Sequence, residues 1–158
     1  MRACRMSLPR RLPPLHYFIA GLIVAEGSFG KKSHRNPGRF TFTNTDPKLI
    51  KLVYDFLVKH LKVPPEKISI YITYNIEVSK LTPEHIKRYW GNLLRAPEDK
   101  IKIYPYRRKV KQIRKKAAYG ICQLRINDIE IRSKIETFIN TIINNLNQAA
   151  GEGHTESP

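Results

Sequence analysis

One stretch constrains the fold of this chain more than any other, the apolar run LHYFIAGLIVAEGSFG over residues 15–30. The run is shorter than the roughly 20 apolar residues that a helix needs to span a bilayer. A helix that is apolar on every side must be buried on every side. We therefore expect a buried helix that ends near Glu26, the one carboxylate of the run.

Two features of this run point to a specific arrangement. Gly21 and Ala25 lie four residues apart on one helix face, where small side chains let a second helix approach closely. Glu26 would lie at the C-terminal end, where the helix dipole disfavours a negative charge by about 0.3–1 kcal/mol. A carboxylate in that position suggests a compensating cation such as a metal ion. The alternative is an ordinary core helix whose last residue is solvated.

Residues 19–27, IAGLIVAEG, closely resemble the LAGLIDADG motif of homing endonucleases, and Ser28-Phe29 match its usual continuation. Glu26 fills the position of the family's acidic metal ligand. Val24 is a departure, because the family often has an acidic residue there. The resemblance covers about residues 15–146, is moderate over 40–46 and is weaker beyond residue 80. It implies the LAGLIDADG homing-endonuclease fold.

The charge of the chain predicts a polyanionic partner. Lys and Arg number 29 against 13 Asp and Glu, which gives a formal net charge of +16. Such an excess favours nucleic acid first and an anionic membrane surface second. A basic protein of the ribosomal type is the alternative, and it would also bind nucleic acid. The hydrophobic content of 41% is sufficient for a folded core.

The cysteines and the N-terminal residues bear on location. Cys4 and Cys122 have no CxxC spacing and no clustered histidines, so they predict neither a zinc site nor a disulfide framework. Residues 1–14 form a basic, Pro-rich arm that lies on DNA, is disordered or serves as a transit peptide. Without a secretory or transmembrane segment, we expect an intracellular protein that is not secreted, either cytoplasmic in a prokaryote (archaeal or bacterial) or organellar.

Capping residues and hydrophobic spacing divide the rest of the chain into helices and strands. Asp46 and Thr82 each precede a proline and open a helix, and a last helix begins near Asp128. Strands that alternate inward apolar with outward polar residues are expected over 39–44, 67–76, 99–108 and 117–127. The first of these pairs with the segment after Gly27 through a turn at 36–38. We expect a single domain over residues 15–147 and a disordered tail over 148–158.

This order of elements predicts an α+β fold, a curved antiparallel sheet with helices on one face and solvent on the other. The outward residues mix cations with Thr, Asn, Gln and Tyr, whereas a face made only for solubility would favour Lys and Glu. Such donors and acceptors suit phosphates and base edges. The predicted DNA-binding residues of this face are Ser28, Lys32, His34, Asn36, Arg39, Thr41, Thr43, Tyr71, Thr73, Gln123 and Arg125.

A strongly basic run, RRKVKQIRKK, follows at residues 107–116. One interpretation is a solvated loop. In a chain with this net charge, contact with DNA phosphates is at least as good an interpretation. We therefore add Arg107, Arg108 and Lys109 to the predicted DNA-binding residues.

The resemblance also implies a homodimer, because the family builds its active sites where two motif helices pack side by side and this chain has one motif. The interface would contain Ala20, Gly21, Val24 and Ala25. A C2 dimer reads a long, partly palindromic site. The two Glu26 carboxylates would then repel each other, and Mg²⁺ with oxygen ligands would resolve that repulsion. The Ala25 carbonyl is the family's usual companion ligand.

Three further residues are implied as catalytic. By position, Asn44 matches a polar residue, often Gln, that orients water in the family, although Asn is shorter. Lys48 matches a basic residue near the same site, and the alternative is a surface lysine in the first turn of a helix. The family also uses a lysine from the second half of the domain, for which Lys102 and Lys109 are both candidates.

We therefore expect a homodimeric, intron-encoded endonuclease that makes Mg²⁺-dependent staggered cuts in double-stranded DNA. Its partners would be DNA and a second copy of itself, with no membrane and no small-molecule substrate. One alternative is an RNA-splicing maturase or a DNA-binding regulator of the same fold that has lost cleavage. Another is a basic RNA-binding module, which would show no metal-dependent activity and no demand for carboxylates.

Overall fold

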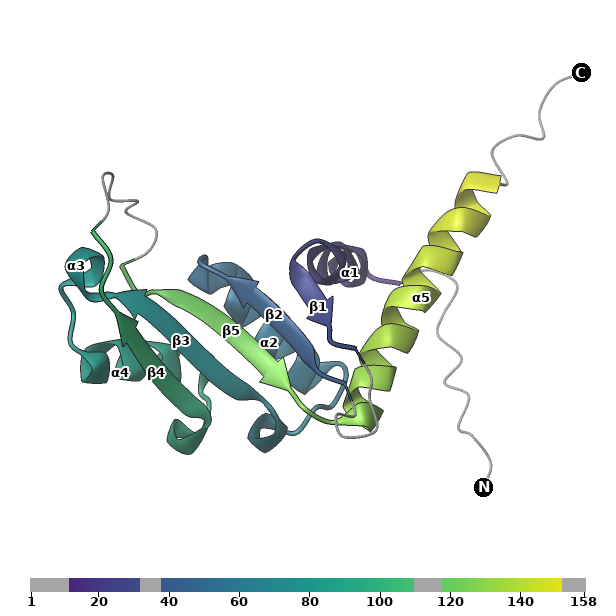
Figure 1. Cartoon of the computed structure of the whole chain (residues 1–158). Helices are drawn as coiled ribbons and strands as arrows, with labels where there is room; N and C mark the ends of the chain where they lie inside the picture. The colour runs from purple at the N-terminus through teal and green to yellow at the C-terminus, as the bar shows by residue number, and fades with distance from the viewer. Residues whose placement is uncertain (1–11, 32–37, 110–117, 152–158) are drawn as a thin grey trace, which may run out of the picture.

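Five helices and a five-stranded mixed sheet make up an α+β fold in the computed structural model, which describes residues 12–31, 38–109 and 118–151 (Figure 1). The helices are α1 (Pro14–Glu26), α2 (Pro47–Lys59), α3 (Ile76–Ser79), α4 (Pro83–Leu94) and α5 (Ile129–Gly151). The strands are β1 (Gly27–Phe29), β2 (Phe40–Asn44), β3 (Ser69–Asn75), β4 (Ile101–Tyr106) and β5 (Ile121–Ile126).

Side-chain caps start three of the helices where the sequence predicts them. The Asp46 carboxylate accepts a hydrogen bond from the Lys48 backbone N–H at 2.9 Å. The Thr82 hydroxyl accepts one from the N–H of His85 at 3.2 Å, and Asp128 accepts one from the N–H of Glu130 at 3.0 Å. These bonds satisfy N–H groups that have no partner within the helix. At its other end α5 continues to Gly151, beyond the predicted end of the domain at residue 147.

The sheet has the strand order β1-β2-β5-β3-β4. Three of the strand pairs are antiparallel, namely β1–β2, β2–β5 and β5–β3. The fourth pair, β3–β4, is parallel. The prediction of a purely antiparallel sheet is therefore wrong at this edge. The reason lies in the connection, because the chain leaves β3, forms α3 and α4 and returns to begin β4 at the same end. Parallel neighbours require a crossover of this kind.

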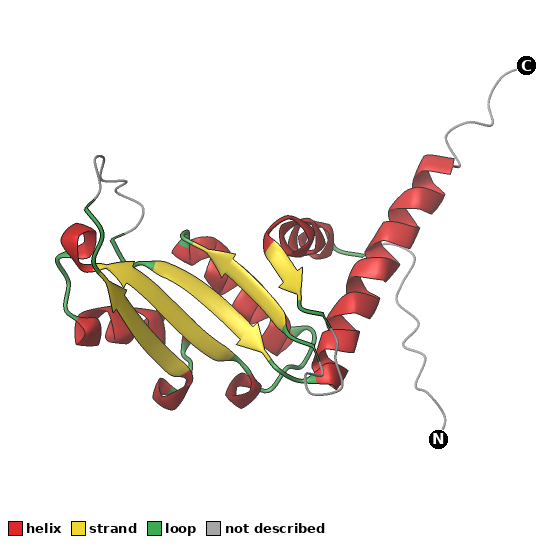
Figure 2. Cartoon of the chain, in the orientation of Figure 1, coloured by secondary structure: helices red, strands yellow, loops and turns green. Residues whose placement is uncertain are grey.

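The predicted alternation of inward and outward residues is confirmed along the central strands. Phe40, Phe42, Ile70, Ile72 and Leu124 are each fully buried. Helices α2 and α4 contribute to the same core and cover the same face of the sheet (Figure 2). The core also includes Leu12, so the predicted N-terminal arm is packed at its end, while residues 1–11 lie outside the described part of the chain.

Helix α1 lies at the β1 edge of the sheet, where it contacts β2, α2 and α5. Helix α5 packs on α1 and projects beyond the sheet (Figure 1), and Leu146 in its distal half is exposed. The buried Arg132 joins α5 to the end of β1, donating to the Gly30 carbonyl at 2.6 Å and pairing with Glu136 at 2.9 Å. Across the described residues, no helix is both long and apolar enough to cross a membrane.

A histidine near the start of α1 packs against two other aromatic rings. The His16 ring lies 5.2 Å from that of Phe56 and 5.4 Å from that of His60, measured between centroids. Burial lowers the pKa of His16 below its ordinary value of 6.5, and the nearby His60 lowers it further. Below about pH 6.5 the unfolded chain therefore binds more protons at this residue than the folded chain does.

We expect the free energy of unfolding to fall as the pH drops from about 8 to about 5. Denaturant unfolding at the two pH values measures the difference. His16→Phe keeps a ring in place and removes the proton-binding group, so it should reduce this dependence. His85→Gln, on the exposed side of α4, is the control and should leave the dependence unchanged. An equal dependence in wild type and His16→Phe would show that other groups cause it.

Candidate active site and nucleic-acid interface

Glu26 is the last residue of α1, and its side chain is exposed. The chain passes from this helix into β1 without a loop, because Gly27 takes an extended conformation with φ −84° and ψ 159°. A Cβ atom at Gly27 would collide with the backbone carbonyl of Ile23. The same carbonyl accepts the Gly27 N–H bond that closes the helix. Glycine is thus what allows the carboxylate to lie at this tight helix-to-strand junction.

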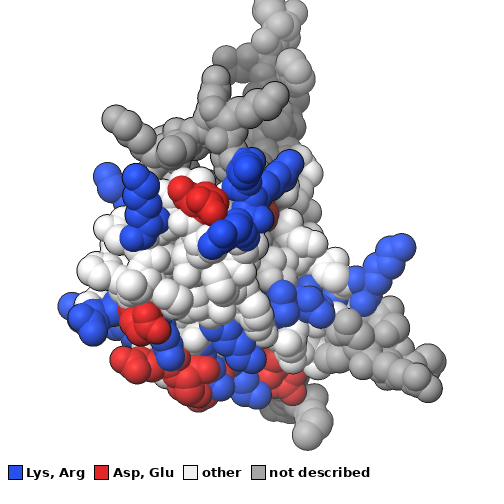
Figure 3. Space-filling view, turned by 60° about the vertical axis from the view of Figure 1, so that its left-hand side comes forward, with Lys and Arg blue, Asp and Glu red and all other residues white. Residues whose placement is uncertain are grey.

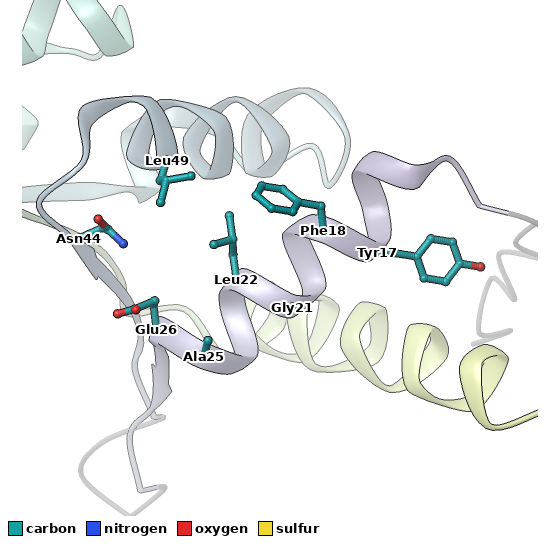
Figure 4. Close-up of a pocket in the computed structure, with 8 residues that line it drawn as sticks. All are labelled: Tyr17, Phe18, Gly21, Leu22, Ala25, Glu26, Asn44 and Leu49. Atoms are coloured by element: carbon teal, nitrogen blue, oxygen red, sulfur yellow. The ribbon is translucent and has the colours of Figure 1, made fainter. Parts of the chain in front are cut away.

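Glu26 shares a surface hollow with Asn44, the residue that the sequence predicts beside it (Figure 4). The hollow has a volume of about 430 Å³ and lies between α1 and the start of α2. The Asn44 Oδ1 atom accepts a hydrogen bond from the Asp46 N–H at 2.8 Å, which holds the amide in place. Figure 4 shows the Glu26 and Asn44 side chains toward one end of the hollow, with Phe18 and then Tyr17 farther along α1. We call this space the Glu26 hollow.

Within the described part of the chain, helix α1 buries only one of its faces, so burial on every side would require a second molecule. Ile19, Ala20 and Ile23 are buried in the core of the chain. The opposite face exposes Phe18 by 52% and Val24 by 61%. An apolar composition predicts that both faces of a helix are covered, but it does not say whether the covering residues come from the same chain or from a second one.

The small residues divide between the two faces. Ala25 and Gly21 are on the exposed side, and a Cβ atom at Gly21 would find no atom of another described segment within 4 Å. Ala20 is 3% exposed and packs inside the chain. Ala20 is therefore a core residue and not part of an interface, whereas Gly21, Val24 and Ala25 are accessible to a second molecule.

Neither Lys48 nor Lys102, two of the three candidate catalytic lysines, lines the Glu26 hollow. Lys48 is an exposed residue in the first turn of α2 and does not line the hollow. Lys102 lies on β4, and three strands separate β4 from β1. With strands spaced by about 4.8 Å, the two edges are roughly 19 Å apart. One chain therefore does not bring Lys102 to Glu26.

We call the face of the sheet opposite α2 and α4 the open face. It brings together most of the predicted DNA-binding residues. Strand register aligns Thr43, Gln123, Tyr71 and Lys102 in one row across four strands, and paired residues share a face. The next row aligns Ser28, Thr41 and Arg125. None of the residues in the five strands is Asp or Glu. With the β4 edge turned forward, Figure 3 shows Lys and Arg around a largely uncharged area and the acidic residues gathered mainly at its lower margin.

Hydrogen bonds link these polar side chains to one another. The Gln123 amide donates to the Thr43 hydroxyl at 3.1 Å and accepts from the Arg125 guanidinium at 2.7 Å. Arg39, just before β2, is partly buried, and its Nε atom has no hydrogen-bond partner within the described ranges. The face thus presents preorganised donors and acceptors of the kind that read phosphates and base edges.

Some predicted contacts lie at the border of the described residues or beyond it. Lys32, His34 and Asn36 fall outside the described residues, as does the basic run from residue 110. Arg107, Arg108 and Lys109 are exposed just after β4. The Asn75 side chain holds this segment, donating to the Arg108 carbonyl at 2.7 Å and accepting from its N–H at 3.3 Å.

The predicted interface omitted three residues that the structure exposes on the same side of the sheet. Tyr104, Tyr106 and Ile121 are exposed by 48%, 41% and 37%. The alternation of β4 already directs Tyr104 outward, and Tyr106 has the same parity. Their outward direction therefore follows from the alternation of the two strands.

The metal-ligand set within one chain is small. Among the residues that the structure describes, no group of three or more His, Cys, Asp and Glu side chains is placed to hold a metal ion. Glu26 and the Ala25 carbonyl are adjacent in the last turn of α1, where carbonyls lack donors within the helix. Mg²⁺ is commonly held by one or two carboxylates together with substrate phosphates. The residues present therefore fit Mg²⁺ but not a closed protein cage such as a structural zinc site.

Comparison with protein-family models, with curated proteins and with solved structures gave no match to this chain.

Proposed function

We propose that this chain is a homodimeric, intron-encoded DNA endonuclease of the LAGLIDADG homing type, which makes staggered double-strand cuts in a long, pseudo-palindromic target. The observation that carries the proposal is the position of Glu26. Its carboxylate is exposed at the end of a helix whose outer face is apolar, lined by small residues and not covered by any residue that the structure describes. If α1 were an ordinary core helix with a solvated last residue, we would expect its apolar outer face to be covered as well.

A second copy of the chain is the partner that suits α1. Phe18 and Val24 leave apolar surface in water, and burying such surface is worth about 25 cal/mol per Å². Gly21 leaves room for a neighbouring backbone to approach. A twofold axis beside Gly21 and Ala25 would bring the two Glu26 hollows close to each other, because an isologous interface uses the same patch twice.

The open face of the sheet supports duplex DNA as the substrate. Its two rows of Thr, Gln, Ser and Arg side chains lie on strands that carry no carboxylate. A β-ribbon of this kind fits the major groove of B-DNA. The net charge of +16 supplies the sequence-independent attraction to phosphates.

In this proposal each group near Glu26 has a separate task. Glu26 and the Ala25 carbonyl would hold Mg²⁺, which when bound supplies Lewis-acid stabilisation of charge at the scissile phosphate. The Asn44 amide, held by its bond to Asp46, would orient the attacking water by a hydrogen bond. The side chains of the sheet would fix the register of the DNA so that the phosphate meets this water.

The first test is cleavage of DNA that carries the joined flanks of the interrupted host gene. We expect staggered cuts with Mg²⁺ and none with EDTA, while binding survives in both. DNA of the same length and composition but scrambled sequence is the control substrate. Tight binding without cutting under all metal conditions would overturn the cleavage proposal and favour the non-cleaving regulator or the maturase.

The mass of the protein in solution tests the proposed interface. We expect light scattering to give twice the chain mass of 18.4 kDa for wild type and 18.4 kDa for Gly21→Arg. Gly21 is exposed, a Cβ atom there meets no atom of another described segment within 4 Å, and arginine favours helix more than glycine does, so the monomer should fold. Asn92→Arg adds the same charge to an exposed site on α4 and should remain dimeric. A monomeric wild type would remove the basis of the proposed active site.

A further inference from the structure

Three planar side chains stand in series on the β3–β4 side of the open face. The Arg125 guanidinium lies 3.9 Å from the centroid of the Tyr71 ring. The Tyr104 ring is 5.8 Å from that of Tyr71, and the two planes are within 12° of parallel. Arg125 comes from β5 on one side of β3, and Tyr104 comes from β4 on the other. The series thus runs outward across the sheet and ends at an exposed ring.

The strands around this series carry polar and cationic side chains and no acidic residue. Tyr71, Thr73, Tyr104 and Gln123 line a second hollow of about 420 Å³ on the open face. The Lys102 Nζ atom lies 5.5 Å from the centroid of the Tyr71 ring. No residue of β3, β4 or β5 is acidic. Tyr104 and Tyr106 leave 48% and 41% of their surface in water, which a solubility role does not require.

Double-stranded nucleic acid offers no base faces on which such rings could stack. In double-stranded nucleic acid the faces of the bases are covered by their neighbours, so only edges and phosphates are accessible. Unpaired bases expose their faces and stack on tyrosine rings and on arginine planes. Phosphates beside them are held by nearby lysine and arginine side chains. Parallel rings, an arginine plane and an adjacent lysine are the groups that an unpaired strand requires.

We propose that the β3–β4 side of the open face binds an unpaired strand of nucleic acid, with a base stacked on Tyr104 and a phosphate held by Lys102. The site is separate from the Glu26 hollow, which lies beyond the opposite edge of the sheet. It needs neither metal nor cleavage. The inference therefore goes beyond the proposed endonuclease activity. The site shares Tyr71 and Lys102 with the surface proposed for duplex DNA, so strand binding and duplex cleavage are measured separately to distinguish the failure of one proposal from the failure of the other.

The test is a binding titration of the full chain in EDTA, followed by fluorescence anisotropy. The probes are labelled oligothymidylate and oligouridylate strands of about 12 nucleotides, within the range of sites built on such surfaces, and a mixed-sequence duplex with the same number of phosphates. We expect both strands to bind more tightly than the duplex. Tyr104→Ala should weaken strand binding by at least about fivefold, because stacking on one aromatic ring contributes that much or more.

Matched variants separate stacking from charge and from misfolding. Tyr104→Phe keeps the ring and should bind the strands as wild type does. Lys102→Ala should weaken binding and reduce its salt dependence, whereas Arg88→Ala, an equal loss of charge on an exposed site of α4, should change binding much less. Thermal unfolding checks that each variant is folded, and Tyr104 is exposed enough for truncation to leave the core intact.

A positional readout completes the experiment. A strand carrying 5-iodouracil should crosslink to Tyr104 on irradiation, and the crosslink should map to the β4 peptide by mass spectrometry. The difference in affinity between the DNA and RNA strands then identifies which of the two the site prefers. Equal binding by wild type and Tyr104→Ala, or crosslinks confined to the β1–β2 side, would overturn the proposal. If the strand-binding proposal fails in this way, the endonuclease proposal still stands as long as Tyr104→Ala cleaves duplex DNA.

Discussion

Changing Glu26 to glutamine is expected to abolish DNA cleavage and to leave DNA binding intact. Glutamine keeps the shape of the side chain but removes the one carboxylate of the Glu26 hollow. Metal ions stabilise the transition state of such reactions by several kcal/mol. Since about 1.4 kcal/mol corresponds to a factor of ten in rate, the loss should be at least about a thousandfold. The side chain is exposed, so its replacement should not disturb folding.

The measurement is the single-turnover cleavage rate with saturating Mg²⁺, alongside the affinity for the same DNA. Glu84→Gln removes an exposed carboxylate from the first turn of α4 and serves as the matched control. Its cleavage rate should equal that of wild type. If Glu26→Gln still cuts at the wild-type rate, Glu26 is not a ligand of the catalytic metal and the role inferred from its position is wrong.

Gly120→Ala is expected to cause a large loss of stability. Gly120 has φ +80°, and a Cβ atom there would lie 2.7 Å from the Thr73 carbonyl oxygen and 2.8 Å from the Tyr74 Cβ atom. The left-handed conformation costs a residue with a side chain about 1–2 kcal/mol, and overpacking adds about 1–3 kcal/mol. Together they predict a loss of about 2–5 kcal/mol in the free energy of unfolding.

The same substitution at Gly91 gives the control, because it should have the opposite sign. Gly91 lies inside α4, and its added methyl would meet only the Ile101 Cδ1 atom, at 3.4 Å. Alanine within a helix is more stable than glycine by about 0.5–1 kcal/mol. Denaturant unfolding of both variants measures the two effects. Equal stability of wild type and Gly120→Ala would mean that the turn before β5 relaxes freely.

The turn at Gly120 also matters for the open face of the sheet. The Trp90 indole N–H donates to the Tyr119 carbonyl at 2.9 Å, and the rings of Tyr119 and Tyr89 stack with centroids 3.7 Å apart. These contacts hold the start of β5, which carries Gln123 and Arg125. A displaced turn should therefore weaken nucleic-acid binding as well as stability, through the position of those two side chains.

Local signals predicted the elements of the fold well. A capping residue followed by proline acts within one helical turn, so Asp46 and Thr82 marked the starts of α2 and α4. Alternation in β2 and β5 depends only on neighbours along the chain, so the inward positions of Phe40, Phe42 and Leu124 were predictable. The junction of Glu26 with Gly27 was also visible, because both residues belong to one short motif.

Relations between distant segments were not predictable in the same way. The parallel pairing of β3 with β4 depends on how α4 packs, which no residue of either strand determines. The assignment of Ala20 to the core and of Gly21 to the surface depends on which side of α1 meets the sheet. Equally, the sequence did not reveal that Lys102 lies at the edge opposite to Glu26.

By itself, the sequence determined a basic α+β chain with an acidic residue at the end of an apolar helix and a polar face on its strands. These properties follow from charge, from side-chain periodicity and from capping, all of which act over a few residues. Only the tertiary structure decided that Glu26 and Asn44 share a hollow, that one face of α1 stays uncovered and that Tyr71, Tyr104 and Arg125 stand in series. Each of those results depends on how strands and helices far apart in the chain pack together, and packing is set by the whole core.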